Sequence, residues 1–197
     1  MKKLIALSLV MLGITGFTLP AEAADGEKWT LPKPVTEGGQ PLMEALSQRQ
    51  SNRNFSDKPI SEQILSDLLW ATWGINRPDG KRTAPTARNT QEIIVFAALE
   101  NGVWLYGPSE NTLTKVLPDD TRSAFGGAPL SLIYAAPANS ELSGFHVGSL
   151  YQNAGLFCAS AGLANVVKIT GRDALDGKLA LPEGYKVFIV HSIGWPR

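Results

Sequence analysis

The sequence of 197 residues contains 44% hydrophobic, 18% charged and 8% aromatic residues, which excludes a disordered, collagen-like or fibrous protein. Its 18 basic and 18 acidic residues balance, so the charge gives no reason to expect nucleic acid or an anionic membrane as the main partner. Because Cys158 is the only cysteine, the chain cannot form an internal disulfide. Its stability must come from packing, helped by a cofactor or by a second subunit.

The first 23 residues have the pattern of a secretory signal peptide. Two lysines precede an apolar run over residues 4–19, and Ala21-Glu22-Ala23 is typical of a cleavage site. Pro20 interrupts the apolar run before it reaches the roughly 20 residues that a membrane-spanning helix needs. We therefore expect cleavage after Ala23 and a periplasmic or secreted mature chain without a stable membrane anchor.

An extended arm and two helices are expected before residue 75. The arm covers residues 24–40, which are polar and rich in glycine and proline, without an apolar period. The second helix should begin after Ser61, whose hydroxyl can cap it, and end at Gly74. A shorter helix over 41–49 should bury one apolar face, formed by Leu42, Ala45 and Leu46.

Beyond residue 75 a long loop and several strands are predicted. Residues 75–91 lack periodicity, and long loops of this kind are usually functional or disordered. Two apolar runs over 92–99 and 103–106 flank Asn101-Gly102, which is a strong hairpin signal. The remaining expected elements are short helical pieces near 109–116 and 119–125, a buried strand over 128–136, a long apolar helix over 145–161 and a central strand over 185–193. This order favours an α+β domain over a doubly wound one.

Several chemistries have no motif in the sequence. The chain contains neither a phosphate-binding glycine loop nor the strained serine turn of the hydrolases. His146 and His191 lack neighbours at metal-ligand spacing, so both are expected to be structural and no metal site is predicted.

Two polar strings are the candidate binding residues. In residues 49–53 two arginines and a serine alternate, so an extended backbone would place two guanidinium groups and a hydroxyl on one side, where phosphate could bind. Taken alone, these residues are better explained as a basic cluster on a solvated surface. In residues 85–91, Asn89 and Gln91 offer amide groups that suit the edge of a heteroaromatic ring, although capping of a turn is the simpler explanation.

Four motifs in order resemble the FMN-dependent nitroreductase family. They are R-x-S-x-R at 49–53, P-T-x-x-N-x-Q at 85–91, QNAGLFCASAGL at 152–163 and LPEGYKVFIVHSIGWP at 181–196. Order and spacing match over residues 41–197, and the text around the long loop and hairpin is closest to the branch of thiazole- and oxazole-forming (azoline) dehydrogenases. The resemblance implies one nitroreductase-like domain over 41–197, with a central mixed, mainly antiparallel sheet flanked by helices.

The resemblance also implies that the chain binds FMN. The cofactor-binding residues that it implies are Arg49, Gln50, Ser51, Arg53, Asn89, Thr170, Gly171 and Arg197. The stretch from Arg49 to Ser51 would hold the phosphate and ribityl chain, Arg53 would reach the polar edge of the flavin, and Asn89 its pyrimidine side. Thr170 and Gly171 would present a backbone N–H to flavin N5, although the family often has an acidic residue at position 170. Arg197 is the remaining late cation for the phosphate.

The implied activity is ping-pong electron transfer through flavin N5 from a small-molecule donor to a small organic acceptor. No catalytic acid or base is expected, because the cofactor carries the chemistry. The resemblance places FMN at a homodimer interface built partly by the helix over 145–161. Small residues that would allow a second helix to approach are Gly148, Ala154, Gly155, Ala159 and Gly162.

Two other functions remain open. An exported chain meets little NAD(P)H, so it could be a non-catalytic periplasmic flavin- or ligand-binding protein. It could also be an azoline-type oxidase acting on peptides with partner enzymes.

Overall fold

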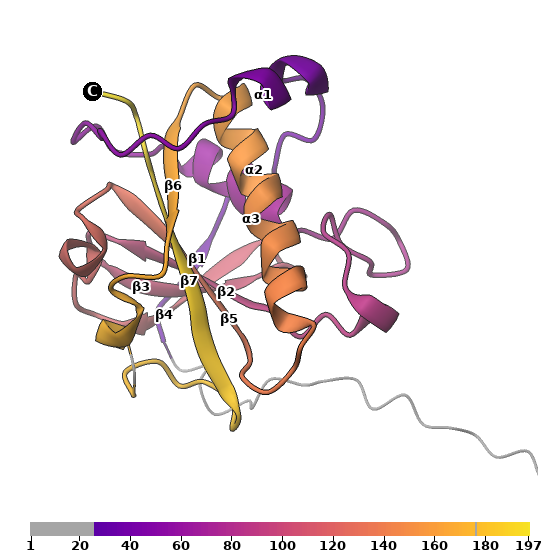
Figure 1. The fold of residues 1–197 in the computed structure, drawn as a ribbon, viewed down its shortest axis with the longest axis vertical. Coiled ribbons are helices and arrows are strands. Elements are labelled where there is room, and N and C mark those ends of the chain that lie inside the picture. The colour runs from indigo at the N-terminus through magenta and orange to yellow at the C-terminus, as the bar shows by residue number, and fades with distance from the viewer. Residues whose placement is uncertain (1–25, 176) are drawn as a thin grey trace, which may run out of the picture.

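An open sheet of seven strands, in the order β1-β4-β3-β2-β5-β7-β6, forms the framework of the computed structural model, which describes residues 26–175 and 177–197 (Figure 1). The strands are β1 (Lys28–Thr30), β2 (Ile94–Leu99), β3 (Gly102–Gly107), β4 (Thr112–Leu117), β5 (Leu130–Pro137), β6 (Ala164–Lys168) and β7 (Tyr185–Gly194). All six pairings of neighbouring strands are antiparallel. The α+β class and the mainly antiparallel sheet are therefore confirmed, while the predicted signal peptide lies outside the described residues.

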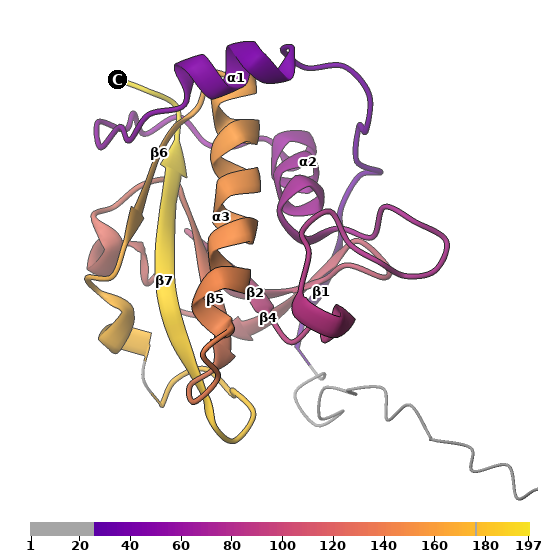
Figure 2. The same cartoon turned by 45° about the vertical axis from the view of Figure 1, so that its right-hand side comes forward.

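Helices cover one face of this sheet, as Figure 2 shows for α2 and α3. The helices are α1 (Leu42–Gln48), α2 (Glu62–Trp73) and α3 (Ser143–Ser160), and the 3₁₀ turns are η2 (Ala87–Asn89), η3 (Arg122–Phe125) and η4 (Arg172–Leu175). Side chains alternate along β2, so Val95 and Ala97 pack toward α2 and α3, while Phe96 packs on the other face with residues of η3 and η4. None of the described helices is long and apolar enough to span a membrane.

The best-marked helix of the sequence forms as predicted. Ser61 caps α2, because its Oγ accepts the N–H of Ile64 at 3.3 Å. Gly74 ends the helix with extended backbone angles, φ −69° and ψ 159°. A Cβ atom there would lie 2.3 Å from Cδ1 of Trp70, so the position needs glycine for space and not for a left-handed turn.

Two expectations about secondary structure were wrong. Residues 109–116 do not form a helical piece, since Thr112–Leu117 is strand β4, paired with β3 on one side and β1 on the other. The alternation of threonines around the buried Leu113 has the period of a strand, and the hairpin with β3 selects it. Strand β6 was not predicted, because its five residues follow α3 too closely to form a separate signal.

The short helix α1 buries less than its pattern predicts. Ala45 is buried, but Leu42 is 64% exposed and Leu46 is 44% exposed. Similarly, Ala154 on α3 lies fully inside the core, whereas Phe145 at the start of that helix is 74% exposed. The small residue Ala154 therefore packs within its own chain, and the apolar surface of α3 left uncovered is that of Phe145 and its neighbours.

Candidate functional site

The segment over residues 49–54 runs without helix or strand from α1 across the ends of β6 and β7, beside the C-terminus (Figure 1). Its backbone is fixed from both sides. The N–H of Asn52 donates to the carbonyl of Asn165 on β6 at 2.8 Å, and the N–H of Arg197 donates to the carbonyl of Asn54 at 3.2 Å. The structure thus brings the first motif and the C-terminal residue together.

Arg49 and Arg53 lie at different heights along β6. A Cβ atom on Gly155 of α3 would be 3.7 Å from both Cδ of Arg49 and Oδ1 of Asn165, so Arg49 lies beside the start of β6. At the end of β6, burial and the nearby charge of Arg53 lower the pKa of Lys168. Three residues of strand separate Asn165 from Lys168, which is roughly 10 Å. Arg49 and Arg53 therefore lie near different parts of β6.

These basic side chains, which we call the cationic group (Arg49, Arg53, Lys168 and Arg197), lack acidic partners. None of the four forms an ion pair with a carboxylate in residues 26–175 and 177–197. A neighbouring cavity of about 420 Å³ is lined by polar side chains that include Gln50, Asn52 and Asn165. None of the four cations is among the residues that line this cavity, so the anion site indicated by the cationic group and the polar cavity are neighbouring features of the same segment.

The turn after β6 places Thr170 and Gly171 next to Lys168. Gly171 has φ +84°, and a Cβ atom there would lie 2.3 Å from the carbonyl oxygen of Ala124. The amine of Lys168 donates to the carbonyl of Phe125 at 2.7 Å. The turn is thus packed on η3, and Thr170 itself is exposed. Sequence reasoning missed Lys168, although it stands two residues before Thr170.

Asn89 lies elsewhere in the chain. It belongs to the loop over residues 85–91, in which the N–H of Ala87 donates to Nε2 of His146 at 2.9 Å. His146 stands near the start of α3. Gly155, which lies beside Arg49, comes nine residues later, so roughly 13 Å of helix separates His146 from Gly155. One chain does not bring Asn89 to the cationic group, and its role in binding stays a prediction.

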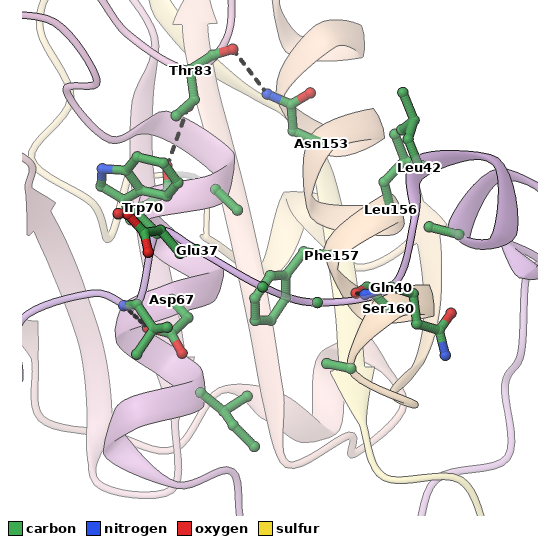
Figure 3. A pocket seen from close by; sticks show the side chains of 18 residues that line it. Glu37, Gln40, Leu42, Asp67, Trp70, Thr83, Asn153, Leu156, Phe157 and Ser160 are labelled. Atoms are coloured by element: carbon green, nitrogen blue, oxygen red, sulfur yellow. Dashed lines mark hydrogen bonds between the residues drawn. The ribbon is translucent and has the colours of Figure 1, made fainter.

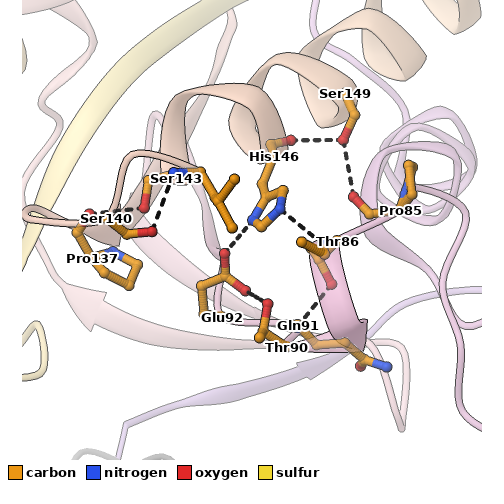
Figure 4. A network of polar contacts seen from close by, with 12 residues as sticks. Pro85, Thr86, Thr90, Gln91, Glu92, Pro137, Ser140, Ser143, His146 and Ser149 are labelled. Atoms are coloured by element: carbon orange, nitrogen blue, oxygen red, sulfur yellow. Dashed lines mark hydrogen bonds and ion pairs between the residues drawn. The ribbon is translucent and has the colours of Figure 1, made fainter.

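Next to this loop lies the pair that sequence reasoning missed most clearly, formed by Glu92 and by His146 of α3 (Figure 4). Nδ1 of His146 contacts Oε1 of Glu92, and the side chains are 8% and 13% exposed. The two residues are 54 positions apart, so no local spacing could reveal the contact.

A second cavity, of about 540 Å³, lies between the arm over residues 35–40, α2 and α3 (Figure 3). Trp70 and Phe157 supply apolar walls, and its charged lining residues are Glu37 and Asp67. Because its lining contains no lysine or arginine, this cavity is unsuited to a phosphate group.

Two other chemically notable residues are buried. His191 and Cys158 are both 0% exposed. Burial lowers the pKa of the His191 ring to about 3 and raises the pKa of the Cys158 thiol, so the buried ring and thiol are both neutral near pH 7. In the part of the chain that the structure describes, no group of three or more potential metal ligands gathers.

Comparison with known proteins identifies the family of this chain. The sequence profile of the nitroreductase family matches residues 46–195. The chain belongs to the nitroreductase family. The crystal structure of a candidate nitroreductase from Ralstonia eutropha JMP134 is 34% identical, covers 86% of this chain and 90% of its own, and superimposes with a TM-score of 0.80.

Two more distant structures share the fold of this nitroreductase-family protein. A chain of the Escherichia coli microcin synthetase McbBCD complex, solved with a truncated precursor, is 19% identical with a TM-score of 0.63, and covers 98% of this chain and 79% of its own. A candidate nitroreductase from Desulfovibrio desulfuricans, solved with FMN, is 16% identical with a TM-score of 0.59, and covers 81% of this chain and 88% of its own.

Proposed function

We propose that this nitroreductase-family protein is an exported FMN-dependent oxidoreductase that passes electrons from a small-molecule donor to a small organic acceptor by ping-pong turnover. The observation that carries the proposal is the cationic group, which has no acidic partner among the residues that the structure describes. FMN, when bound, would supply the electron transfer through its N5 position. The FMN complex of the Desulfovibrio relative supports this choice of cofactor.

Different residues along β6 would bind different parts of FMN. Arg49, Gln50 and Ser51 would hold the phosphate and ribityl end, with Arg197 joined to the same segment through Asn54. Arg53 would face the polar edge of the ring, and Lys168 beside it adds a second cation. The turn at Thr170 and Gly171 would offer a backbone N–H toward N5, a donor that favours the reduced cofactor.

Removing Arg49 should weaken FMN binding. Charge-assisted bonds to phosphate are strong enough that Arg49→Ala should reduce FMN affinity roughly tenfold or more, with little change for riboflavin, which lacks the phosphate. Flavin fluorescence titration of the purified protein measures both affinities. Lys28→Ala is the matched control, because Lys28 is exposed on β1 at the opposite edge of the sheet.

Equal affinity of the wild-type protein for FMN and riboflavin would contradict the proposed phosphate site. Steady-state rates with dithionite-reduced or donor-reduced protein and quinone or nitroaromatic acceptors then separate the two functional alternatives. A ping-pong enzyme gives parallel double-reciprocal lines, whereas a flavin-binding protein without catalysis gives no turnover.

We also propose a homodimer, because one chain leaves the Asn89 loop and the cationic group apart and leaves Phe145 exposed. Phe145→Asp should convert the dimer to a monomer, since a buried unpaired carboxylate is unfavourable at an apolar interface, and should weaken FMN binding as well. Lys28→Asp is the control for an added charge. Sedimentation of the FMN-loaded protein measures the assembly, and a wild-type monomer with full FMN content contradicts the proposal.

A further inference from the structure

The loop over residues 85–91 adopts a conformation that needs external support. Arg88, Asn89 and Gln91 all have positive φ angles, of 55°, 54° and 48°. Such angles are unfavourable for residues other than glycine and persist where the surroundings fix them. Within the loop, Oγ1 of Thr86 accepts the N–H of Gln91 at 3.0 Å. From outside, α3 holds the loop through His146 (Figure 4).

The bonds of His146 determine where its proton lies. Nε2 contacts the N–H of Ala87 at 2.9 Å, and a backbone N–H can only donate, so Nε2 must be the unprotonated nitrogen. Nδ1 therefore carries the proton and donates to Oε1 of Glu92. The ring is neutral and its two nitrogens are both occupied, which makes His146 a positioning residue and not an acid or base for a ligand.

Other groups around the pair keep Glu92 charged. Although burial by itself raises the pKa of Glu92, hydrogen bonds from Thr90, from its own backbone and from His146 lower it overall. From β7, Tyr185 faces the pair, and burial and the charge of Glu92 raise the pKa of this phenol. Arg82 lines the same small cavity as Glu92 and bonds Gln91 at 2.7 Å. A second hydrogen bond also joins α3 to the loop, because the hydroxyl of Ser149 donates to the carbonyl of Pro85 at 3.4 Å.

We propose that Glu92 and His146 form a pH-sensitive positioning pair that holds the 85–91 loop at neutral pH and releases it in acid. A proton added to Nε2 turns the acceptor of the Ala87 N–H into a second donor, so the bond is lost. The new positive charge stays on the ring opposite the Glu92 carboxylate. The link to FMN rests on the proposed function, because Asn89 is carried by this loop.

The first experiment examines the pair without FMN. Nitrogen NMR of the apoprotein at neutral pH should show His146 as the neutral tautomer with its proton on Nδ1. Hydrogen exchange of the Ala87 amide, corrected for its intrinsic pH dependence, should lose protection roughly five- to tenfold as His146 becomes protonated, the equivalent of one hydrogen bond. A proton on Nε2 at neutral pH, or unchanged protection of Ala87, overturns the proposal.

The second experiment measures FMN affinity across the pH range in which the NMR experiment shows His146 gaining its second proton. Affinity should fall about three- to tenfold more in the wild type than in His146→Gln, whose amide oxygen can accept from Ala87 without titrating. The phosphate of FMN gains a proton at about pH 6 with both proteins, so the difference between them isolates the pair. Glu92→Gln should move the transition to lower pH, because it removes the anion facing the ring. Glu110→Gln, at an exposed carboxylate, is the control.

If the pair were purely structural, substituting it would lower FMN affinity by the same factor at every pH. That result would contradict the proposal. If the wild type binds no FMN at any pH, the proposed function fails while the NMR experiment still decides the role of the pair. Circular dichroism of both variants shows whether each has folded.

Discussion

Unfolding free energy should fall by about 4–5 kcal/mol between pH 6.5 and pH 3 through His191 alone. The ring is fully buried on β7, where Nε2 lies 3.0 Å from Oδ1 of Asn165 and Nδ1 lies 3.4 Å from the hydroxyl of Tyr134. Because Asn165 offers an acceptor and Tyr134 a donor, both nitrogens are satisfied in the neutral ring. Burial lowers its pKa from 6.5 to about 3.

The sign follows from proton uptake by the unfolded chain. Below pH 6.5 the unfolded His191 binds a proton that the folded ring does not bind, so each pH unit lowers the unfolding free energy by about 1.4 kcal/mol. The loss ends near the folded pKa, where both states are protonated. Above pH 6.5 the contribution is complete and does not change.

Urea unfolding of the wild type and His191→Gln, at one protein concentration and several pH values between 7 and 4, measures this contribution. The variant should be less stable at pH 7, because Tyr134 and Asn165 lose their partner, but its stability should decline less steeply with acid. Equal slopes in the two proteins would falsify the assignment. The carboxylates titrate in both, so the difference between the slopes isolates His191.

Gly171→Ala should destabilise the protein by about 2–5 kcal/mol, the sum of a left-handed backbone and an overpacked contact. The added Cβ atom would lie 2.3 Å from the carbonyl oxygen of Ala124 and 2.9 Å from the ring of Phe125. Neither the backbone of η3 nor the buried ring can yield easily. The turn at Thr170 should therefore shift, and FMN affinity should fall with stability.

Gly184→Ala is the matched control for that substitution. Gly184 has φ +77°, close to the +84° of Gly171, but nothing lies within 4 Å of its added Cβ atom. It should therefore lose only the backbone contribution, about 1–2 kcal/mol. Equal losses at the two positions, measured by urea unfolding, would show that contact with η3 does not matter at Gly171.

Local patterns determined much of the fold. The cap at Ser61, the apolar period of α2 and α3, and the hairpin at Asn101 depend on residues close together in the chain, and each forms as predicted. The prediction of a helical piece at β4 was wrong and β6 was missed, because a short strand gains its stability from the strands beside it, including strands distant in sequence. β4 pairs with the adjacent β3 on one side and on the other with β1, whose Trp29 lies 84 residues before its partner Leu113.

The candidate site divides in the same way. The alternation of Arg49, Ser51 and Arg53 indicated an anion site from the sequence by itself, and the order of the motifs indicated the family. Only the tertiary structure set Lys168 near Arg53, separated Asn89 from the cationic group by about half the length of α3, and joined Glu92 to His146. The physical reason is that charge type and periodicity are properties of the chain, whereas burial, hydrogen-bond partners and the resulting protonation depend on which distant segments the sheet brings into contact.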